Sequence, residues 1–375
     1  MSTYPTLPSD LIPGDCRFGC GPSKVRPAQL DAIANGASII GTSHRQPAVK
    51  NLVGEVRDGL RQLFSLPEGY EIVLSLGGAT AFWDAATFGL IEQKSAHLSF
   101  GEFSGKFAKA SKQAPWLAEP RVVAAEPGTA PSPSELDGTD ADVVAWAHNE
   151  TSTGAMVPVT RPATDALVLV DATSGAGGLP VEMQNADVYY FSPQKCFASD
   201  GGLWLAAMSP AAIERIAKIK QTERFIPAFL DLQTAVDNSR KNQTYNTPAV
   251  ATLLMLADQV KWMNDNGGLD GMVARTTANS TALYDWAERS EVATPFVANP
   301  KDRSLVVGTI DFAESVDAAE LAKALRENGI LDTEPYRKLG RNQLRIGMFP
   351  AIDTNDIEAL TGAIDYLLEQ GVGAK

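Results

Sequence analysis

Short, continuous apolar runs recur along the chain from residue 71 to residue 208, each bounded by turn residues or polar segments. Continuous rather than alternating hydrophobicity is typical of strands that are covered on both faces. Between the runs lie segments with helical spacing, such as residues 49–64 and 79–90. This alternation predicts an α/β fold with helices packed on a mainly parallel sheet. The predicted strands span residues 71–76, 96–100, 121–124, 142–147, 166–170, 188–191 and 202–208, with the last of these antiparallel.

A change of pattern near residue 265 predicts two domains. With 375 residues the chain is long enough for one large and one smaller unit. We expect residues 1–265 to form an N-terminal arm and a large domain, and residues 266–375 to form a small α+β domain. A long helix over 247–264, beginning at a Thr-Pro pair, would end the large domain. In the small domain we expect helices at 270–289, 317–328 and 354–369, capped in the last two cases by Asp317 and Thr354, and strands at 304–311 and 343–348.

Composition excludes several classes of partner. The net charge of -13 would repel a nucleic-acid backbone, and the chain has no basic stripe to offset it, although arginines focused in a cleft could still hold a small anion. No apolar run is long enough to span a membrane. Three cysteines without paired spacing favour a reduced, cytoplasmic location, and three histidines are too few to favour a metal site.

Two segments carry the chemistry. VLVDATSGAGG ends an apolar run on Asp171, and YYFSPQKCFASDGGLW places Lys195 in a turn after the next run. Either residue alone is commonly a turn cap or a surface charge. Their spacing between two strand-like runs instead predicts a pyridoxal phosphate (PLP) site, with Asp171 paired to the ring nitrogen and Lys195 forming the Schiff base. Once displaced by the substrate amine, Lys195 would act as the general base.

The other requirements of that cofactor also have candidates. In SLGGATAFWDAA a glycine turn enters a helix, so free N–H groups of Ala79 and Thr80 could meet the phosphate. Phe103 follows a strand at the carboxyl edge of the sheet, where it could stack on the ring or simply be core. Thr151 could donate to the phenolic oxygen of the cofactor or cap a turn.

Motifs along nearly the whole chain carry a resemblance. RFGCGPSKV, GTSHRQ, GGATAFWDA, HNETSTG, VDATSGAGG, SPQKCFASDGGLW, TYNTPA and EPYRKLGRNQLRIGMFPA occur in this order. The chain therefore resembles the phosphoserine aminotransferase family of class V, fold-type I PLP enzymes, closest to its actinobacterial-type branch. The resemblance implies a homodimer with active sites at the subunit interface. It also implies a set of cofactor contacts: Ala79, Thr80, Phe103, Thr151, Asp171, Gln194 and Lys195 from one subunit, and Asn246 and Thr247 from the other.

For the substrate, the resemblance implies that Arg345 binds the α-carboxylate, which suits a bidentate guanidinium. His44 and Arg45 would meet the distal phosphate or carboxylate, and Arg337, Lys338 and Arg341 are further phosphate candidates. Three positions depart from the family pattern: Ala79 replaces an arginine common in relatives, Tyr336 and Arg337 stand near the place of a His-Arg pair, and Cys196 replaces an asparagine. We interpret Cys196 as a packed, neutral thiol.

The expected reaction is reversible transamination between O-phospho-L-serine with 2-oxoglutarate and 3-phosphohydroxypyruvate with L-glutamate, in serine biosynthesis. The nearest alternative is another class V aminotransferase of the serine/alanine–glyoxylate type. A PLP-dependent carbon–sulfur lyase would need a reactive cysteine on a mobile loop, which the chain lacks. A binding protein without turnover would have little need for both anion clamps and the lysine.

Overall fold

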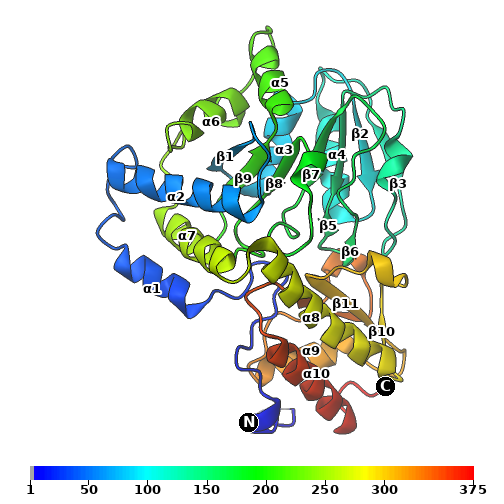
Figure 1. The fold of residues 1–375 in the computed structure, drawn as a ribbon. Helices are drawn as coiled ribbons and strands as arrows, with labels where there is room; N and C mark the ends of the chain where they lie inside the picture. The colour runs from blue at the N-terminus through cyan, green and yellow to red at the C-terminus, as the bar shows by residue number, and fades with distance from the viewer. Residues whose placement is uncertain (1–3) are drawn as a thin grey trace.

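The computed structural model describes residues 4–375, and a seven-stranded sheet forms its centre (Figure 1). The strands lie in the order β1-β9-β8-β7-β4-β2-β3. All neighbours are parallel except β9, which runs antiparallel to β1 and β8, as predicted. The bounds are β1 Glu71–Leu76, β2 Ser95–Ser99, β3 Arg121–Ala124, β4 Val143–Ala147, β7 Leu167–Asp171, β8 Val188–Phe191 and β9 Leu203–Met208. The expected α/β class is confirmed.

Helices cover both faces of this sheet, and the strands divide their side chains between two cores. Val168 and Val170 of β7 belong to the core under α2 and α7, whereas Leu167 and Leu169 belong to the core under α3, α4, α5 and α6. The helices are α1 Pro27–Asn35, α2 Pro47–Leu63, α3 Gly78–Gly89, α4 Glu102–Gln113, α5 Pro210–Lys220, α6 Leu232–Ser239 and α7 Val250–Asp265. The two cores explain why the inner strands are apolar without alternation.

One strand departs from the prediction of burial on both faces. Strand β3 pairs only with β2, at the edge of the sheet, and Val122 is 46% exposed. An edge strand has a neighbour on one side only, so its apolar run does not imply the same coverage.

The C-terminal part is an antiparallel three-stranded sheet with three helices. The strands are β10 Ala293–Pro295, β11 Val307–Phe312 and β12 Gln343–Gly347, and the helices are α8 Gly268–Arg289, α9 Ala318–Glu327 and α10 Thr354–Glu369. Leu7 and Phe18 of the N-terminal arm pack into this core, and Figure 1 shows the N-terminus beside these helices. The division of the chain near residue 265 stays a prediction.

Helix starts show where local signals were and were not sufficient. Asp317 caps α9 as predicted, since its side chain accepts from the N–H groups of Ala319 and Glu320. The predicted cap at Thr354 is wrong: Asp353 holds the cap position, and the Thr354 hydroxyl donates to Asn279 Oδ1 at 2.7 Å. Helix α7 begins at Val250 rather than at Thr247, because Ala249 is still extended, with ψ 91°, and holds the cap position.

The remaining elements are short. They comprise the two-residue strands β5 Asn149–Glu150 and β6 Ala155–Met156, and the 3-10 helices Ser9–Leu11, Pro133–Leu136, Met183–Asn185, Ala228–Leu230, Pro300–Asp302 and Arg337–Leu339. Within residues 4–375 no helix is both long and apolar enough to cross a membrane. The same residues contain no cluster of His, Cys, Asp or Glu side chains suited to a metal ion.

Candidate active site

A cavity of about 280 Å³ opens at the carboxyl ends of β4 and β7. This is the edge at which open parallel sheets bind ligands. Strands β4 and β7 contribute their last residues, Ala147 and Asp171, and the turn after β8 contributes Gln194 and Lys195. The full lining is Gly77, Gly78, Ala79, Thr80, Trp83, Phe103, Ala147, Asn149, Thr151, Asp171, Thr173, Ser174, Gln194, Lys195 and Gly202. Every cofactor residue predicted from one subunit therefore lines the same cavity.

The Lys195 amine lies at the cavity wall against the N-terminal arm. Its Nζ donates to the carbonyl oxygen of Cys20 at 2.7 Å. Burial removes water from the charged amine and is the main reason that the pKa of Lys195 is lowered to about 8. The positive charge of the nearby Arg345 acts in the same direction. Gly21 permits this approach because a Cβ there would lie 2.0 Å from Nζ. About a tenth of this amine is therefore neutral at pH 7, far more than for an ordinary lysine, as a nucleophile or base requires.

The Asp171 carboxylate is buried and held by fixed donors. Its Oδ1 accepts from Thr173 N at 3.0 Å and from Thr173 Oγ1 at 2.6 Å, and its Oδ2 accepts from Trp83 Nε1 at 2.8 Å. Burial raises the pKa of Asp171, and these hydrogen bonds act in the opposite direction. We did not predict Trp83 from the sequence. Its spacing from Ala79 and Thr80 on one helix was the available signal.

The glycine turn is built as a strand-to-helix cradle, with one correction. Gly77 and Gly78 both adopt positive φ, 103° and 69°, at the start of α3. The prediction of a free N–H at Ala79 is wrong, because this N–H donates to Ser192 Oγ at 2.7 Å. Ser192 is a further contact that the sequence did not reveal. Thr80 lies in the first turn of the helix, where backbone N–H groups have no carbonyl acceptor within the helix. Its N–H can therefore donate to a ligand.

Phe103 and Thr151 reach the cavity from two segments joined by Glu150. Phe103 lies in the first turn of α4, where its N–H donates to Glu150 Oε2 at 3.0 Å. Thr151 follows β5 directly, and its hydroxyl donates to Ser174 Oγ at 2.8 Å. Glu150 is fully buried and also accepts from the N–H and hydroxyl groups of Ser104 and Ser152. One carboxylate thus fixes both neighbours.

Arg345 extends from β12 to the segment that carries Thr151. Its Nη1 donates to the Thr151 carbonyl oxygen at 3.1 Å, its Nε is buried without a hydrogen-bond partner among the described residues, and its guanidinium lies 5.4 Å from the Tyr336 ring. Tyr336 in turn packs against Phe103, with ring centroids 5.9 Å apart. The predicted carboxylate arginine is therefore close to the cavity but is not among its lining residues.

The other predicted phosphate ligands lie outside the cavity lining. Lys338 pairs with Glu102 at 2.5 Å, and Arg337 is exposed. Arg341 forms an ion pair with Asp311 and lies 4.3 Å from the Phe296 ring. An arginine that is already paired and stacked is a poor candidate for a substrate ligand.

Four predicted residues lie together on two surface loops instead. Thr247 Oγ1 lies 3.2 Å from His44 Nδ1, and Arg45 Nη1 donates to Gln243 Oε1 at 2.9 Å. Asn246 and Thr247 are both exposed. Within one chain, none of His44, Arg45, Asn246 and Thr247 lines the cavity.

Cys196 is enclosed by protein. Its thiol donates to the Ser174 carbonyl oxygen at 3.3 Å, and burial raises the pKa of Cys196 well above its usual value. The thiol therefore remains protonated at neutral pH.

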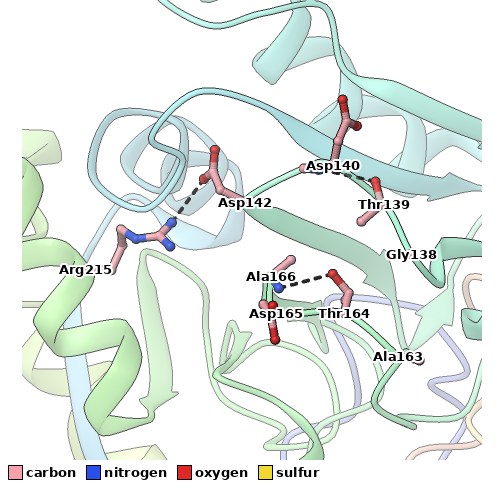
Figure 2. Close-up of a pocket in the computed structure, with 10 residues that line it drawn as sticks. Gly138, Thr139, Asp140, Asp142, Ala163, Thr164, Asp165, Ala166 and Arg215 are labelled. Atoms are coloured by element: carbon pink, nitrogen blue, oxygen red, sulfur yellow. Dashed lines mark hydrogen bonds and ion pairs between the residues drawn. The ribbon is translucent and has the colours of Figure 1, made fainter.

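A second cavity lies at the opposite edge of the sheet (Figure 2). It is lined by the residues that precede β4 and β7. One of them, Asp142, forms an ion pair with Arg215 at 3.0 Å, which Figure 2 shows as a dashed line. The same carboxylate accepts from the backbone N–H groups of Glu92, Gln93 and Lys94. Asp142 thus fastens a loop, and this edge is not the ligand-binding edge of a parallel sheet.

The residues present in the first cavity fit PLP. A partly neutral lysine and a carboxylate fixed by three donors line the same cavity as an aromatic ring and a glycine cradle at a helix start. Gln194 Oε1 and Asn149 Oδ1 are buried without hydrogen-bond partners among the described residues, as expected of a cavity shaped for a polar ligand.

Comparison with known proteins agrees with this geometry. The model of the aminotransferase class-V family matches residues 28–334. A phosphoserine aminotransferase of Corynebacterium glutamicum is 75% identical over 378 aligned positions, covering all of both chains, and one of Nocardioides is 64% identical, covering 97% of this chain and 98% of its own. The crystal structure of a phosphoserine aminotransferase from Cytophaga hutchinsonii is 25% identical, with a TM-score of 0.87, and covers 93% of this chain and 98% of its own. The chain therefore belongs to the class-V aminotransferase family.

Proposed function

We propose that the chain is a phosphoserine aminotransferase. It transfers an amino group reversibly between O-phospho-L-serine with 2-oxoglutarate and 3-phosphohydroxypyruvate with L-glutamate, a step of serine biosynthesis. The observation that carries the proposal is the convergence of Lys195 and Asp171 on one cavity in a chain so close to curated phosphoserine aminotransferases.

Bound PLP supplies an aldehyde that takes up the amino group and a ring that withdraws electrons from the substrate Cα. Lys195 would hold the cofactor covalently between turnovers, and its free amine would move the Cα proton. Its carbonyl partner, Cys20, keeps the free amine beside the cavity. Because its pKa is lowered to about 8, the amine can accept a proton near neutral pH.

The walls of the cavity orient the cofactor. Asp171 would accept a hydrogen bond from the protonated ring nitrogen, and Phe103 would pack on the ring face. Ala79 and Thr80 would contact the cofactor at the helix start, and Gln194 would do so from the turn after β8. Thr151 would donate to the phenolic oxygen in place of Ser174, its acceptor in this structure. All of these residues line one cavity, which supports their assignment as a set.

Arg345 binds the substrate α-carboxylate. Its buried, unpartnered Nε supports this role because a buried guanidinium donor is costly to leave unpaired. Arg337 and Lys338 are exposed on the adjoining segment and remain candidates for contact with the substrate phosphate.

The active form is a homodimer in which each cavity is completed by the partner subunit. Asn246 and Thr247 would reach the phosphate of the other subunit's cofactor, and His44 and Arg45, which contact the same segment, would supply the distal anion site there. Large apolar side chains are also exposed to solvent, as an interface requires: Leu30, Ile40, Phe225, Phe229 and Tyr245, with Phe225 78% exposed. Three free cysteines favour a cytoplasmic location.

A comparison of phosphoserine with serine as amino donor to 2-oxoglutarate tests the proposal. We expect activity with phosphoserine and little with serine, together with absorbance at about 400–430 nm that is lost in Lys195→Ala. Preference for serine or alanine with glyoxylate would support the other class V activity. Sulfide release from cysteine would indicate a lyase, although no cysteine is among the described residues that line the cavity.

A further inference from the structure

The cavity contains a donor whose role the proposed function does not assign. Trp83 is 7% exposed, and its indole Nε1 donates to Asp171 Oδ2 at 2.8 Å. Both donors from Thr173 bind the other oxygen, Oδ1. Trp83 therefore donates to the oxygen that is left to face a ligand, and the buried hydroxyl of Tyr190 also lies near enough to Asp171 to lower its pKa.

A carboxylate has about four lone-pair positions. Two positions on Oδ1 are filled by Thr173 and one on Oδ2 is filled by Trp83, so the fourth is open to a ligand or to the nearby Tyr190 hydroxyl. Donors fixed on both oxygens prevent the carboxylate from rotating. The remaining position can then be directed at a donor in the cavity, such as a protonated ring nitrogen.

Trp83 also connects the two ends of the cofactor cavity. It lies on α3, the helix whose first turn forms the glycine cradle around Gly78. A residue three or four positions after Ala79 and Thr80 lies on the same face of that helix. A single rigid helix therefore presents the cradle to one end of a ligand and the indole N–H to the carboxylate at the other end.

We propose that Trp83 is a positioning residue, whose indole N–H orients Asp171 as the acceptor for the ring nitrogen of the cofactor. The inference rests on the proposed function, because it concerns the cofactor assigned there. Loss of this donor should weaken the hold of Asp171 on the ring proton while leaving the cavity in place.

Two other titratable groups face Asp171. Lys195 lies across the cavity, and its charge favours the ionised carboxylate. Tyr190 is the register partner of Asp171 on β8, and its buried hydroxyl interacts with the Asp171 carboxylate, which lowers the pKa of Asp171. Burial and the Asp171 charge raise the pKa of Tyr190 well above its usual value, so this hydroxyl does not titrate in the range to be measured.

The test measures protonation of the ring nitrogen directly. The protein is loaded with PLP labelled with ¹⁵N in the ring, and the nitrogen chemical shift is followed against pH by NMR. In Trp83→Phe the ring nitrogen should lose its proton at a pH lower by about one unit or more than in the wild type.

Two matched variants make the result specific. Trp83→Gln places an amide nitrogen the same number of bonds from Cβ as the indole nitrogen, so it should restore much of the wild-type midpoint. Trp116→Phe removes a surface tryptophan that stacks on Phe88 of the same helix, and it should leave the midpoint unchanged. If Trp83→Phe does not fold, Trp83→Met, which also lacks the N–H, takes its place.

An unchanged midpoint in Trp83→Phe or in its substitute overturns the inference, as does a shift of the same size in Trp116→Phe. Failure of the proposed function gives a different result, because the wild type would then hold no labelled cofactor at Lys195.

Discussion

At the scale of single residues, burial determines the chemistry of the site. The same low-polarity surroundings that lower the pKa of Lys195 to about 8 raise the pKa of Asp171. Hydrogen bonds from Thr173 and Trp83 offset this rise for the carboxylate. The lysine donates a hydrogen bond to the Cys20 carbonyl oxygen. The two groups can therefore differ in charge within one cavity.

The role of Arg345 leads to a prediction about substrate affinity. Arg345→Lys should raise the KM for phosphoserine about 10- to 100-fold, because an ammonium cannot bind a carboxylate through two parallel hydrogen bonds. Steady-state kinetics measure the change. Arg341→Lys is the matched control, since Arg341 is already paired with Asp311 and should change KM little. Equal effects of the two substitutions would contradict the assignment of Arg345.

At the scale of elements, Glu150 connects the cap of a helix to the cavity. Its carboxylate accepts hydrogen bonds from the first turn of α4 and from the turn after β5, and within residues 4–375 no ion pair involves it. Backbone donors and the positive end of the helix dipole stabilise the charge instead. This arrangement sets the position of Phe103 relative to Thr151.

Replacing this carboxylate should disturb both stability and cofactor binding. Glu150→Gln places an amide NH₂ against hydrogen-bond donors, so we expect a loss of about 2 kcal/mol in the free energy of unfolding and weaker PLP binding. Urea unfolding and PLP titration measure these effects. Glu119→Gln is a suitable control because Glu119 pairs only at the surface, with Lys112. A variant as stable as the control would exclude this role for Glu150.

Sequence patterns predicted most elements of the large sheet because its inner strands are apolar along their whole length. Val188–Phe191 and Glu71–Leu76 were predicted with their observed bounds. The predicted start of α7 was wrong because the Thr-Pro pair was interpreted as the helix cap, a position that Ala249 holds in the structure.

The site residues that were missed share one cause. Trp83, Ser192 and Glu150 act through contacts with residues distant in sequence, such as Trp83 with Asp171 and Ser192 with Ala79. No local pattern reports such contacts. By contrast, Asp171 and Lys195 follow strands that end at the same edge of the sheet, so topology alone brings them together.

At the scale of the whole molecule, the proposed dimer predicts complementation between inactive variants. Lys195→Ala should inactivate its own subunit's cavity, whereas Arg45→Ala should inactivate the partner's cavity. A hybrid dimer then contains one intact site and one site with both defects. Co-expression of the two variants with different affinity tags should recover about a quarter of wild-type activity in the mixture, because random pairing makes half of the dimers hybrid. No recovery in purified hybrids would contradict shared active sites.

Two buried histidines predict loss of stability in acid. Burial lowers the pKa of both His97 and His148 to about 3. In the unfolded chain these groups bind protons near pH 6.5, so their contribution is present above that pH and is lost as pH falls toward 3. Between pH 7 and pH 4.5 each should cost about 2 kcal/mol of unfolding free energy.

Urea unfolding at the two pH values measures this loss. His97→Gln should show a smaller decline between pH 7 and pH 4.5 than the wild type, because glutamine does not titrate. His44→Gln is the control, since His44 lies on a surface loop. An equal decline in the wild type and in His97→Gln would contradict the account of His97.

The central claim is that Lys195 carries the cofactor at a cavity shared with Asp171. Reduction of the PLP-loaded protein with borohydride, followed by peptide mass spectrometry, tests it most directly. We predict a phosphopyridoxyl group on the peptide that contains Lys195. If phosphoserine is added before the reduction, its amine should replace Lys195 on the cofactor, and the peptide should lose most of this label. Label on another lysine, or none on a folded protein supplied with PLP, would contradict the account.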